Sequence, residues 1–348
     1  MEPDRAAVFP SRPCGDDDAA LGTAAVLVAA ALSAAGQERP LVVTAVGWPA
    51  PKAYVVGHDG QVQVLDTTDG RAVAGANTGA WTTGAAVGPG GRRVYVVNGW
   101  AGVITAVDPR AGKVVGRIHV PAKLAQAVLR PDGERLYVTG GGAVAVVDPG
   151  SFRLVAAIKA GGQPQGIAVT PDGRRLYVAN AQDGTVSVLD TGTASPKTTI
   201  DVAGMPQQVA VSPDGAAVYV SSLDVAEGEG TVSMIDPRTD EVRWSAKVGK
   251  GAGSVAVTPD GRRVYVALDR RVAVLDTTTR TAKTLRLKAT TLAIAPGDRR
   301  VFLSTGNTAT VLDSADNRVL NTFQLSGLDG DGRGFTATAI AFEPLDES

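Results

Sequence analysis

The chain has few of the residues from which redox and metal sites are built. It contains one cysteine, Cys14, and two histidines, His58 and His119, among 348 residues. A single cysteine excludes an internal disulfide framework and a cysteine-based metal cluster, and two histidines leave little for zinc or haem ligation. We therefore expect no metal and no other cofactor.

An excess of charge of one sign is also missing. Thirty-four Lys and Arg residues oppose 35 Asp and Glu residues, for a net charge of -1. No long-range field then favours a phosphate backbone, so nucleic acid is not an expected partner. Nine arginines follow predicted turns, and we expect them to pair locally with the aspartates around them. They are Arg92, Arg93, Arg135, Arg174, Arg175, Arg262, Arg263, Arg299 and Arg300.

The composition is that of a folded all-β chain. Hydrophobic residues make up 44% and charged residues 20% of the sequence, which is too apolar for a disordered chain. The 42 glycines exceed the roughly 7% of average usage, so turns are frequent and long helices few.

The first forty residues differ from the rest. No charged residue occurs from Ala19 to Gln37, and the stretch is mostly alanine. We predict that residues 1–40 form an extension outside the main domain, with an apolar helix over 19–35. It could pack on that domain, anchor the chain to a membrane or act as a leader, although the preceding acidic residues oppose secretion. An extracytoplasmic or envelope location is favoured over a cytoplasmic one, with membrane contact only through 19–35.

Residues 41–348 consist of one unit repeated seven times. The unit is anchored by an aromatic residue followed by Val or Leu, and the anchors are 37 to 46 residues apart. A second series of aspartates closes an apolar run about a dozen residues after each anchor. The anchors are Tyr54, Tyr95, Tyr137, Tyr177, Tyr219, Tyr265 and Phe302, and the aspartates are Asp66, Asp108, Asp148, Asp190, Asp236, Asp276 and Asp313. Repeats of roughly 40 residues with several short strands are typical of β-propeller blades.

Four strands can be assigned within the best-preserved unit. They are expected at 167–169, 176–179, 185–189 and 198–202, from the innermost to the outermost. A tight turn at Pro171-Asp172-Gly173 separates the first two, because proline presets φ and glycine accepts a positive φ. The sequence therefore predicts a seven-bladed β-propeller of four-stranded blades.

The phrases Tyr95-Val96-Val97-Asn98 and Tyr177-Val178-Ala179-Asn180 resemble the YVTN family of β-propeller repeats. This resemblance covers about residues 41–348. It implies a seven-bladed ring of the kind often found in prokaryotic surface-layer or envelope proteins, with no shared catalytic residues. Some relatives of the fold are lactonases or lyases.

Two segments compete for the strand that closes the ring. Both 42–46 and 337–342 read as innermost strands, which makes eight for seven blades. We favour 337–342, because a last strand that completes the first blade leaves no exposed sheet edge.

The candidate binding site lies on the face where two kinds of loop converge around the channel: the loops between second and third strands and those leading into each blade. We call it the loop face. Exposed tryptophans bury a flat apolar face at little entropic cost and so make good anchors for a protein or a sugar ring; the alternative is that each packs on its own blade. The candidate residues are Trp81, Trp100, His58, Asp59, Asn98, Asn180 and Asp183.

We therefore expect a non-enzymatic binding or scaffold propeller with a protein, small-molecule or carbohydrate partner. The alternative is a lactonase-like or lyase-like enzyme that uses Asp224, Glu227 and Glu229, the one acidic cluster on that face. The run 329–334 invites a calcium interpretation, but Arg333 occupies the fifth ligand position and Ile340 the twelfth, so the helix-loop-helix calcium motif fails.

Overall fold

The structure is a computed structural model that describes residues 27–32, 38–43, 52–66, 72–79, 81–269, 271–295, 297, 299–325 and 337–342. For 27–32, 38–43 and most of 337–342 the description is of the backbone. The chain divides into two compact units, Met1–Pro49 and Ala50–Ser348.

The first unit contains a two-stranded antiparallel hairpin. Strand β1 (Leu27–Leu32) pairs with β2 (Glu38–Val43), with Leu27 opposite Val43 and Leu32 opposite Glu38. The predicted helix over 19–35 is therefore wrong for residues 27–32, and the rest of that prediction lies outside the described residues. The helix propensity of alanine exceeds that of other ordinary residues by at most about 0.7 kcal/mol per residue. Pairing with β2 satisfies the backbone N–H and C=O groups that a helix would otherwise satisfy. In the described part of the chain, no helix is long and apolar enough to cross a membrane.

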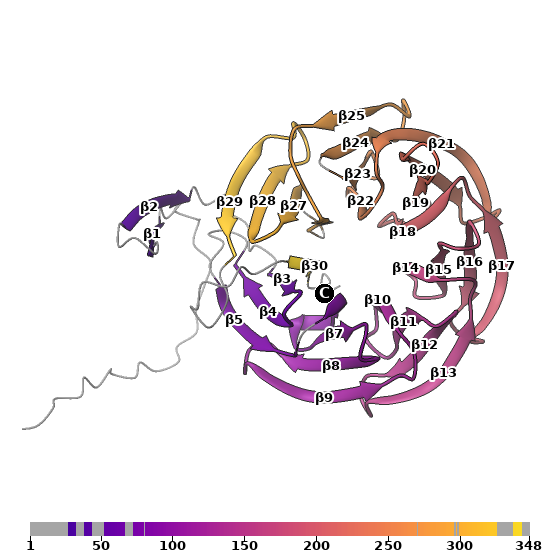
Figure 1. Ribbon diagram of the computed structural model, residues 1–348, viewed down its shortest axis with the longest axis horizontal. Coiled ribbons are helices and arrows are strands. Elements are labelled where there is room, and N and C mark those ends of the chain that lie inside the picture. The colour runs from indigo at the N-terminus through magenta and orange to yellow at the C-terminus, as the bar shows by residue number, and fades with distance from the viewer. Residues whose placement is uncertain are drawn as a thin grey trace, which may run out of the picture. The chain divides into compact units, whose positions relative to one another are not determined.

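The second unit is a ring of seven antiparallel sheets, each of four strands (Figure 1). From the innermost to the outermost strand, blade 1 consists of β30 (Ala337–Phe342), β3 (Ala53–Gly57), β4 (Gln61–Leu65) and β5 (Ala72–Asn77). Blade 2 consists of β6 (Thr82–Val87), β7 (Val94–Asn98), β8 (Val103–Asp108) and β9 (Lys113–His119), with a 3-10 turn η1 (Pro89–Gly91) after β6.

The other blades follow the same order. Blade 3 consists of β10 (Leu124–Leu129), β11 (Leu136–Gly140), β12 (Ala143–Asp148) and β13 (Arg153–Lys159), and blade 4 of β14 (Pro164–Val169), β15 (Arg175–Asn180), β16 (Thr185–Asp190) and β17 (Ser195–Asp201). Blade 5 consists of β18 (Met205–Val211), β19 (Val218–Asp224), β20 (Glu229–Asp236) and β21 (Glu241–Lys250). Blade 6 consists of β22 (Val255–Val257), β23 (Arg263–Ala267), β24 (Val272–Asp276) and β25 (Ala282–Leu285), and blade 7 of β26 (Thr291–Ile294), β27 (Arg300–Thr305), β28 (Thr308–Asp313) and β29 (Val319–Gln324).

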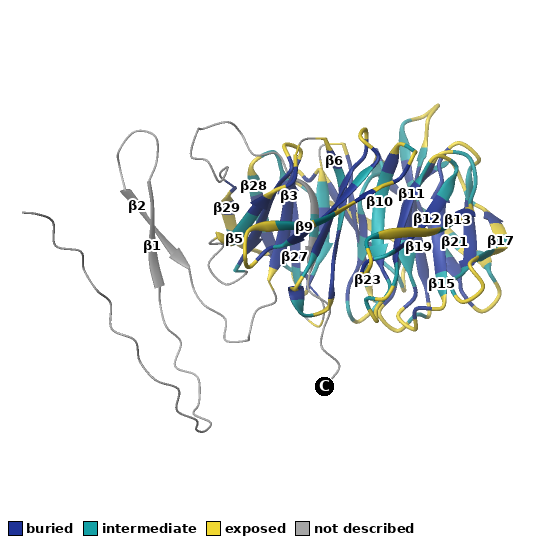
Figure 2. Cartoon of the chain, turned by 90° about the horizontal axis from the view of Figure 1, so that it is seen from below, coloured by how far each residue is buried: buried dark blue, intermediate teal, exposed yellow. Residues whose placement is uncertain are grey.

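The seven aromatic anchors all lie in second strands, so the predicted blade count and strand assignment are confirmed. Second and third strands are buried along most of their length because a neighbouring blade covers each face of the sheet, as the dark blue interior of Figure 2 shows. A strand covered on both faces carries a continuous apolar run rather than an alternating pattern. The sequence Val94-Tyr95-Val96-Val97 in β7 is an example, and all four residues are at most 3% exposed.

The C-terminal strand closes the ring, as predicted. Strand β30 pairs antiparallel with β3, with Ala53 opposite Phe342 and Val56 opposite Ala339, and it lies beside β3 in Figure 1. The competing segment 42–46 begins in β2, whose Val42 pairs with β1 instead. The first blade is thus built from both ends of the propeller sequence.

The turn between first and second strands is held by a Thr or Ser hydroxyl and an aspartate. In blade 4, Asp172 accepts a hydrogen bond from the Thr170 hydroxyl at 2.5 Å and from the Arg174 N–H at 3.0 Å, and Gly173 has φ +70°. The hydrogen bond from Thr170 is the main reason that the pKa of Asp172 is lowered. Ser212 with Asp214 and Thr258 with Asp260 repeat the arrangement. These turns lie on the face opposite the loop face, which we call the turn face.

The strand-ending aspartates hold the turn between third and fourth strands. Asp190, for example, accepts hydrogen bonds from the N–H and hydroxyl of Thr193 at 2.8 and 2.9 Å. Four residues after each of the six aspartates from Asp108 to Asp313 the backbone is left-handed. The residues at this left-handed position are Gly112, Phe152, Ala194, Asp240, Arg280 and Asn317, with φ between 50° and 64°.

Replacing Ala194 by glycine is expected to stabilise the protein by about 0.5–1 kcal/mol. A left-handed conformation costs an alanine roughly 1 kcal/mol, which glycine avoids, and the exposed Ala194 side chain contributes little packing. Urea unfolding monitored by circular dichroism measures the change. Ala111→Gly, in the equivalent turn of blade 2 but outside the left-handed position, is the control and is expected to destabilise slightly. Equal effects of the two substitutions would contradict the conformational explanation.

Candidate functional site

The two candidate tryptophans lie next to each other on the loop face. Trp81 is in the loop that leads into β6, and Trp100 follows β7 in the same blade. The Gly99 N–H donates to the Trp81 carbonyl at 3.1 Å, so the two loops are in direct contact. Trp81 is 57% exposed and Trp100 is 68% exposed, so neither indole is packed away inside its blade.

Each indole is held by a polar neighbour. The His58 ring meets Trp81 edge-on with 4.9 Å between ring centroids, and the Lys123 ammonium lies 4.1 Å from the centre of the Trp100 ring. The second contact is a cation–π interaction, worth about 0.5–1 kcal/mol at an exposed site. The tryptophans are therefore partly ordered before any partner arrives.

The backbone of Trp81 is itself constrained. Its φ is +69°, and Gln163, at the corresponding place in the loop leading into blade 4, has φ +53°. The Trp81 N–H donates to the His58 carbonyl at 2.8 Å, which ties the loop to blade 1. A left-handed conformation is unfavourable for a bulky residue, and such strain often accompanies a functional position.

The other predicted site residues shape the loops. Asp59 is exposed and accepts a hydrogen bond from the Gln61 N–H at 3.1 Å, and Asp183 is exposed and accepts one from the Gly162 N–H at 2.6 Å. Asn98 is 5% exposed and donates to the Gly79 carbonyl at 3.0 Å. Asn180 is fully buried and donates to the Ser187 hydroxyl at 2.8 Å. The side chains of the two asparagines are buried and support the loop face from beneath.

The acidic cluster on the same face is also engaged in local contacts. Asp224 accepts hydrogen bonds from the Ala226 and Glu227 N–H groups at 2.9 and 3.2 Å, and Glu227 lies 3.6 Å from the Lys247 ammonium. A turn held by an aspartate explains this arrangement. Within the described ranges, no three His, Cys, Asp or Glu side chains are placed so that they could hold a metal ion. The run 329–334 lies outside the described residues.

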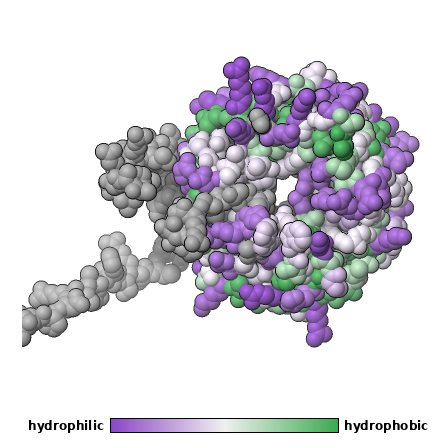
Figure 3. All heavy atoms as spheres, viewed as in Figure 1, coloured by the Kyte–Doolittle hydropathy of each residue, from purple (hydrophilic) through white to green (hydrophobic). Residues whose placement is uncertain are grey.

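The inner strands that line the channel are uncharged. The seven inner strands, β30, β6, β10, β14, β18, β22 and β26, contain no Asp, Glu, Lys, Arg or His. Figure 3 shows the opening at the centre of the ring. Sequence reasoning missed this property, although it can be read from the seven inner-strand sequences once their position is known.

The turn face carries the arginines, and only some of them pair locally. Arg299 lies 3.3 Å from Asp313 in its own blade, as expected. Three others reach the next blade: Arg93 donates to the Pro149 carbonyl at 3.0 Å, Arg175 to the Pro237 carbonyl, and Arg263 to the Ala315 carbonyl at 2.8 Å. The expectation of purely local pairing is therefore wrong for these three, because each precedes the aromatic anchor of its second strand and lies against the neighbouring blade.

In the same three pairs of blades, the residue at the left-handed position also contacts the second strand of the preceding blade. Phe152 lies under the Arg93 guanidinium, with 5.3 Å from its carbon to the ring centroid. Asp240 is 3.5 Å from Arg175, and Asn317 accepts a hydrogen bond from the Tyr265 hydroxyl at 2.6 Å. Burial raises the pKa of Tyr265 to about 12. We call the contacts from the arginine and tyrosine of one second strand to the turn between third and fourth strands of the next blade an interblade clasp.

A cavity of about 560 Å³ opens on the turn face between blades 3 and 4. Three of its charged groups have partners within the lining or beside it, since Arg130 lies 2.6 Å from Asp132 and Asp172 is bound by Thr170. It is lined by Arg130, Pro131, Asp132, Pro171, Asp172, Gly173, Arg174, Asp190, Thr191 and Gly192. The cavity opens on the turn face, opposite the loop face that carries the tryptophans, and we assign it no role.

The blades, the closing strand and the uncharged inner strands define a closed seven-bladed β-propeller. A family profile described as "Outer membrane protein assembly factor BamB" matches residues 100–257 and 228–341, which together cover more than half of the sequence. The chain belongs to this family of propeller repeats. The match does not single out the YVTN repeats among them.

The chain is also similar to a solved structure, a subunit of the hydrazine synthase of Kuenenia stuttgartiensis. The identity is 23% and the TM-score 0.63, over 67% of this chain and 77% of the other. At this identity the likeness extends to the fold alone. A search among curated proteins gave no match.

Proposed function

We propose that the protein is a non-enzymatic binding or scaffold propeller that captures its partner on the loop face around Trp81 and Trp100. The observation that carries the proposal is the pair of adjacent, solvent-exposed indoles, each braced by a polar neighbour. Aromatic side chains of this kind dominate binding energy at interfaces because they bury a large area at a small cost in side-chain entropy.

The chemistry of the face supports binding over turnover. The acidic cluster is used by its own turn and by Lys247, and His58 lies against Trp81. The family description names an assembly factor, which is in keeping with a binding role. The closer resemblance to YVTN repeats, at 95–98 and 177–180, and an envelope location remain part of this proposal.

Replacing both tryptophans by alanine is expected to abolish partner capture without unfolding the ring. Loss of one exposed aromatic hot spot costs about 2 kcal/mol or more, so the double substitution weakens binding by a hundredfold or more. The tagged chain and its variants are used to capture partners from an extract of the source cells. The affinity for the protein captured in stoichiometric amount is then measured with purified components.

Val225→Ala is the matched control. Val225 is 69% exposed on the same face, in the loop between β19 and β20 of blade 5. If the Trp81→Ala/Trp100→Ala double variant still captures the partner, or if Val225→Ala loses capture to the same extent, the tryptophans do not form the binding site. Hydrolysis or elimination lost on neutralising Asp224, Glu227 and Glu229 would favour the enzyme alternative.

A further inference from the structure

Three glutamine side chains without partners form a row at the start of neighbouring inner strands. Gln126 lies in β10, Gln165 in β14 and Gln208 in β18, which belong to the consecutive blades 3, 4 and 5. All three are half-buried, and none of their side-chain amides has a hydrogen bond to another residue of the described chain. A side-chain amide has two N–H donors and a carbonyl acceptor, so each glutamine can both donate hydrogen bonds to a ligand and accept them from it.

Direct contacts show that the three positions are adjacent. The Thr139 hydroxyl donates to the Gln165 carbonyl at 2.7 Å and accepts the Gln126 N–H at 3.0 Å. A Cβ placed on Gly166 would lie 2.8 Å from the Gln208 side-chain oxygen, so that amide crosses to blade 4 over a glycine. We call these three residues the amide row.

The amide row lies at the loop-face end of the inner strands, at or beside a bulge in each strand. The register of β10 against β11 shifts between Leu124 and Ala127, and that of β14 against β15 between Pro164 and Ile167. A bulge turns a side chain out of the regular alternation of the strand. Gln126 and Gln165 lie within these two bulges, and β18 has a corresponding shift between Pro206 and Gln208.

The amide row continues from Trp100. The Leu124 N–H at the start of β10 donates to the Gly99 carbonyl at 3.0 Å, and the preceding residue, Lys123, covers one face of the Trp100 indole. A stacking surface, three free amides and inner strands without ionisable side chains thus occur together.

We infer that the amide row and Trp100 bind an uncharged, polyhydroxylated ligand, an oligosaccharide. This inference rests on the proposed function and names the chemical class of the partner. The inner strands offer no counter-charge to a charged ligand, and the one ammonium beside the amide row, Lys123, already lies on the Trp100 ring. An apolar ligand would cover the half-buried amides and leave them unpaired, and an unpaired buried polar group costs about 1–3 kcal/mol. Sugar hydroxyls donate and accept as amides do, and the C–H face of a pyranose ring stacks on an indole.

The test is calorimetric titration of the purified full chain with three neutral oligosaccharides: cellohexaose, maltohexaose and hexa-N-acetylchitohexaose. At least one is expected to bind, and Gln165→Leu and Gln208→Leu are each expected to weaken that binding tenfold or more. Gln182→Leu is the matched control, because Gln182 is exposed on the same face in blade 4 but outside the amide row. Affinity is expected to be unchanged between about 0.05 and 0.5 M NaCl, since the ligand carries no charge.

Gln165→Ala and Gln208→Ala replace the leucine variants if those do not reach the wild-type melting temperature. The inference is overturned if none of the three sugars binds, if the variants of the amide row bind like Gln182→Leu, or if a neutral peptide such as hexa-alanine binds with the same dependence on the glutamines. Its failure is distinct from that of the proposed function. Partner capture that depends on Trp81 and Trp100 without sugar binding keeps the binding site and rejects only the ligand class.

Discussion

A chain that ends at residue 336 is expected to lose of the order of 5 kcal/mol or more of its unfolding free energy, far more than its twelve missing residues suggest. The deletion removes β30, the inner strand of blade 1, and leaves β3 with an unpaired edge. Ile340 packs against the cluster that contains Val55 and Phe302, so blade 7 loses contacts as well. Deleting several large core side chains at once costs about 2–5 kcal/mol for each well-packed residue.

The measurement compares thermal and urea unfolding of chains that end at 336, 342 and 348. The chain ending at 342 keeps β30 and is expected to unfold like the full chain, whereas the one ending at 336 is expected to lose cooperativity. Equal transitions for 336 and 348 would show that the ring does not depend on closure by its C-terminal strand.

The ring could be predicted from the sequence because its determinants are local and repeated. Tyr177 and its six counterparts mark buried second strands, and Pro171-Asp172-Gly173 marks a turn that needs only a few neighbouring residues. The closing strand was chosen correctly because an unpaired sheet edge is unfavourable in any ring. The helix over 19–35 failed for the opposite reason: whether Leu27–Leu32 is extended depends on its partner Glu38–Val43, which composition does not reveal.

The candidate site could be predicted only in part. Trp81 and Trp100 were placed in loops by their position relative to the strands, and both are exposed. Asn98 was predicted among the residues of the loop face, and its amide turns inward to the Gly79 carbonyl. Gln165 and Gln208 could be placed on the loop face from the sequence, but Gln126 and the adjacency of the three could not, because this adjacency depends on bulges and on neighbours about 40 residues apart, such as Gln126 and Gln165 at the Thr139 hydroxyl.

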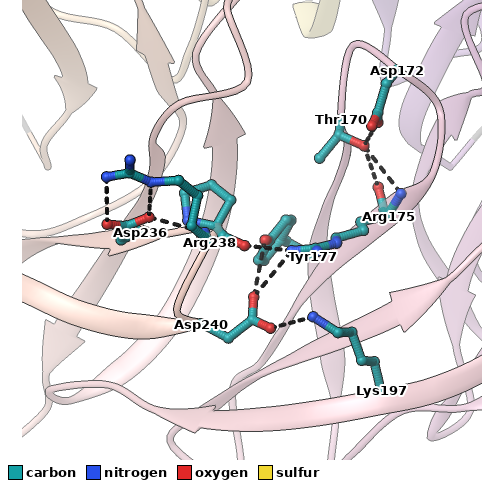
Figure 4. Close-up of polar contacts among 9 residues, drawn as sticks. Thr170, Asp172, Arg175, Tyr177, Lys197, Asp236, Arg238 and Asp240 are labelled. Carbon is teal, nitrogen blue, oxygen red and sulfur yellow. Dashed lines mark hydrogen bonds and ion pairs between the residues drawn. The ribbon is translucent and has the colours of Figure 1, made fainter.

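The interblade clasps could not be predicted from the sequence either, because they join residues that are far apart in the chain. In the clasp between blades 4 and 5, the Asp240 carboxylate lies 2.6 Å from the Lys197 ammonium, 3.5 Å from Arg175 and 3.4 Å from the Tyr177 hydroxyl, as Figure 4 shows. Its side chain is 12% exposed, and its partners come from β15 and β17 of the neighbouring blade, 43 to 65 residues away. Asp240 also has φ +56°, which an aspartate tolerates better than most residues.

Asp240→Ala is expected to destabilise the protein by about 2 kcal/mol. It leaves Arg175 and Lys197 without their carboxylate and places an alanine in a left-handed conformation; the value is below that of a fully buried pair because both cations are partly exposed. Asp240→Asn keeps an acceptor for Tyr177 and suits the backbone, so we expect less than about 1 kcal/mol. Asp316→Ala removes an exposed pair with Arg318 in the equivalent turn of blade 7 and is expected to change stability by no more than about 0.5 kcal/mol. Urea unfolding ranks the three variants, and an Asp240→Ala protein as stable as Asp316→Ala would mean that the Asp240 carboxylate does not help to hold blades 4 and 5 together.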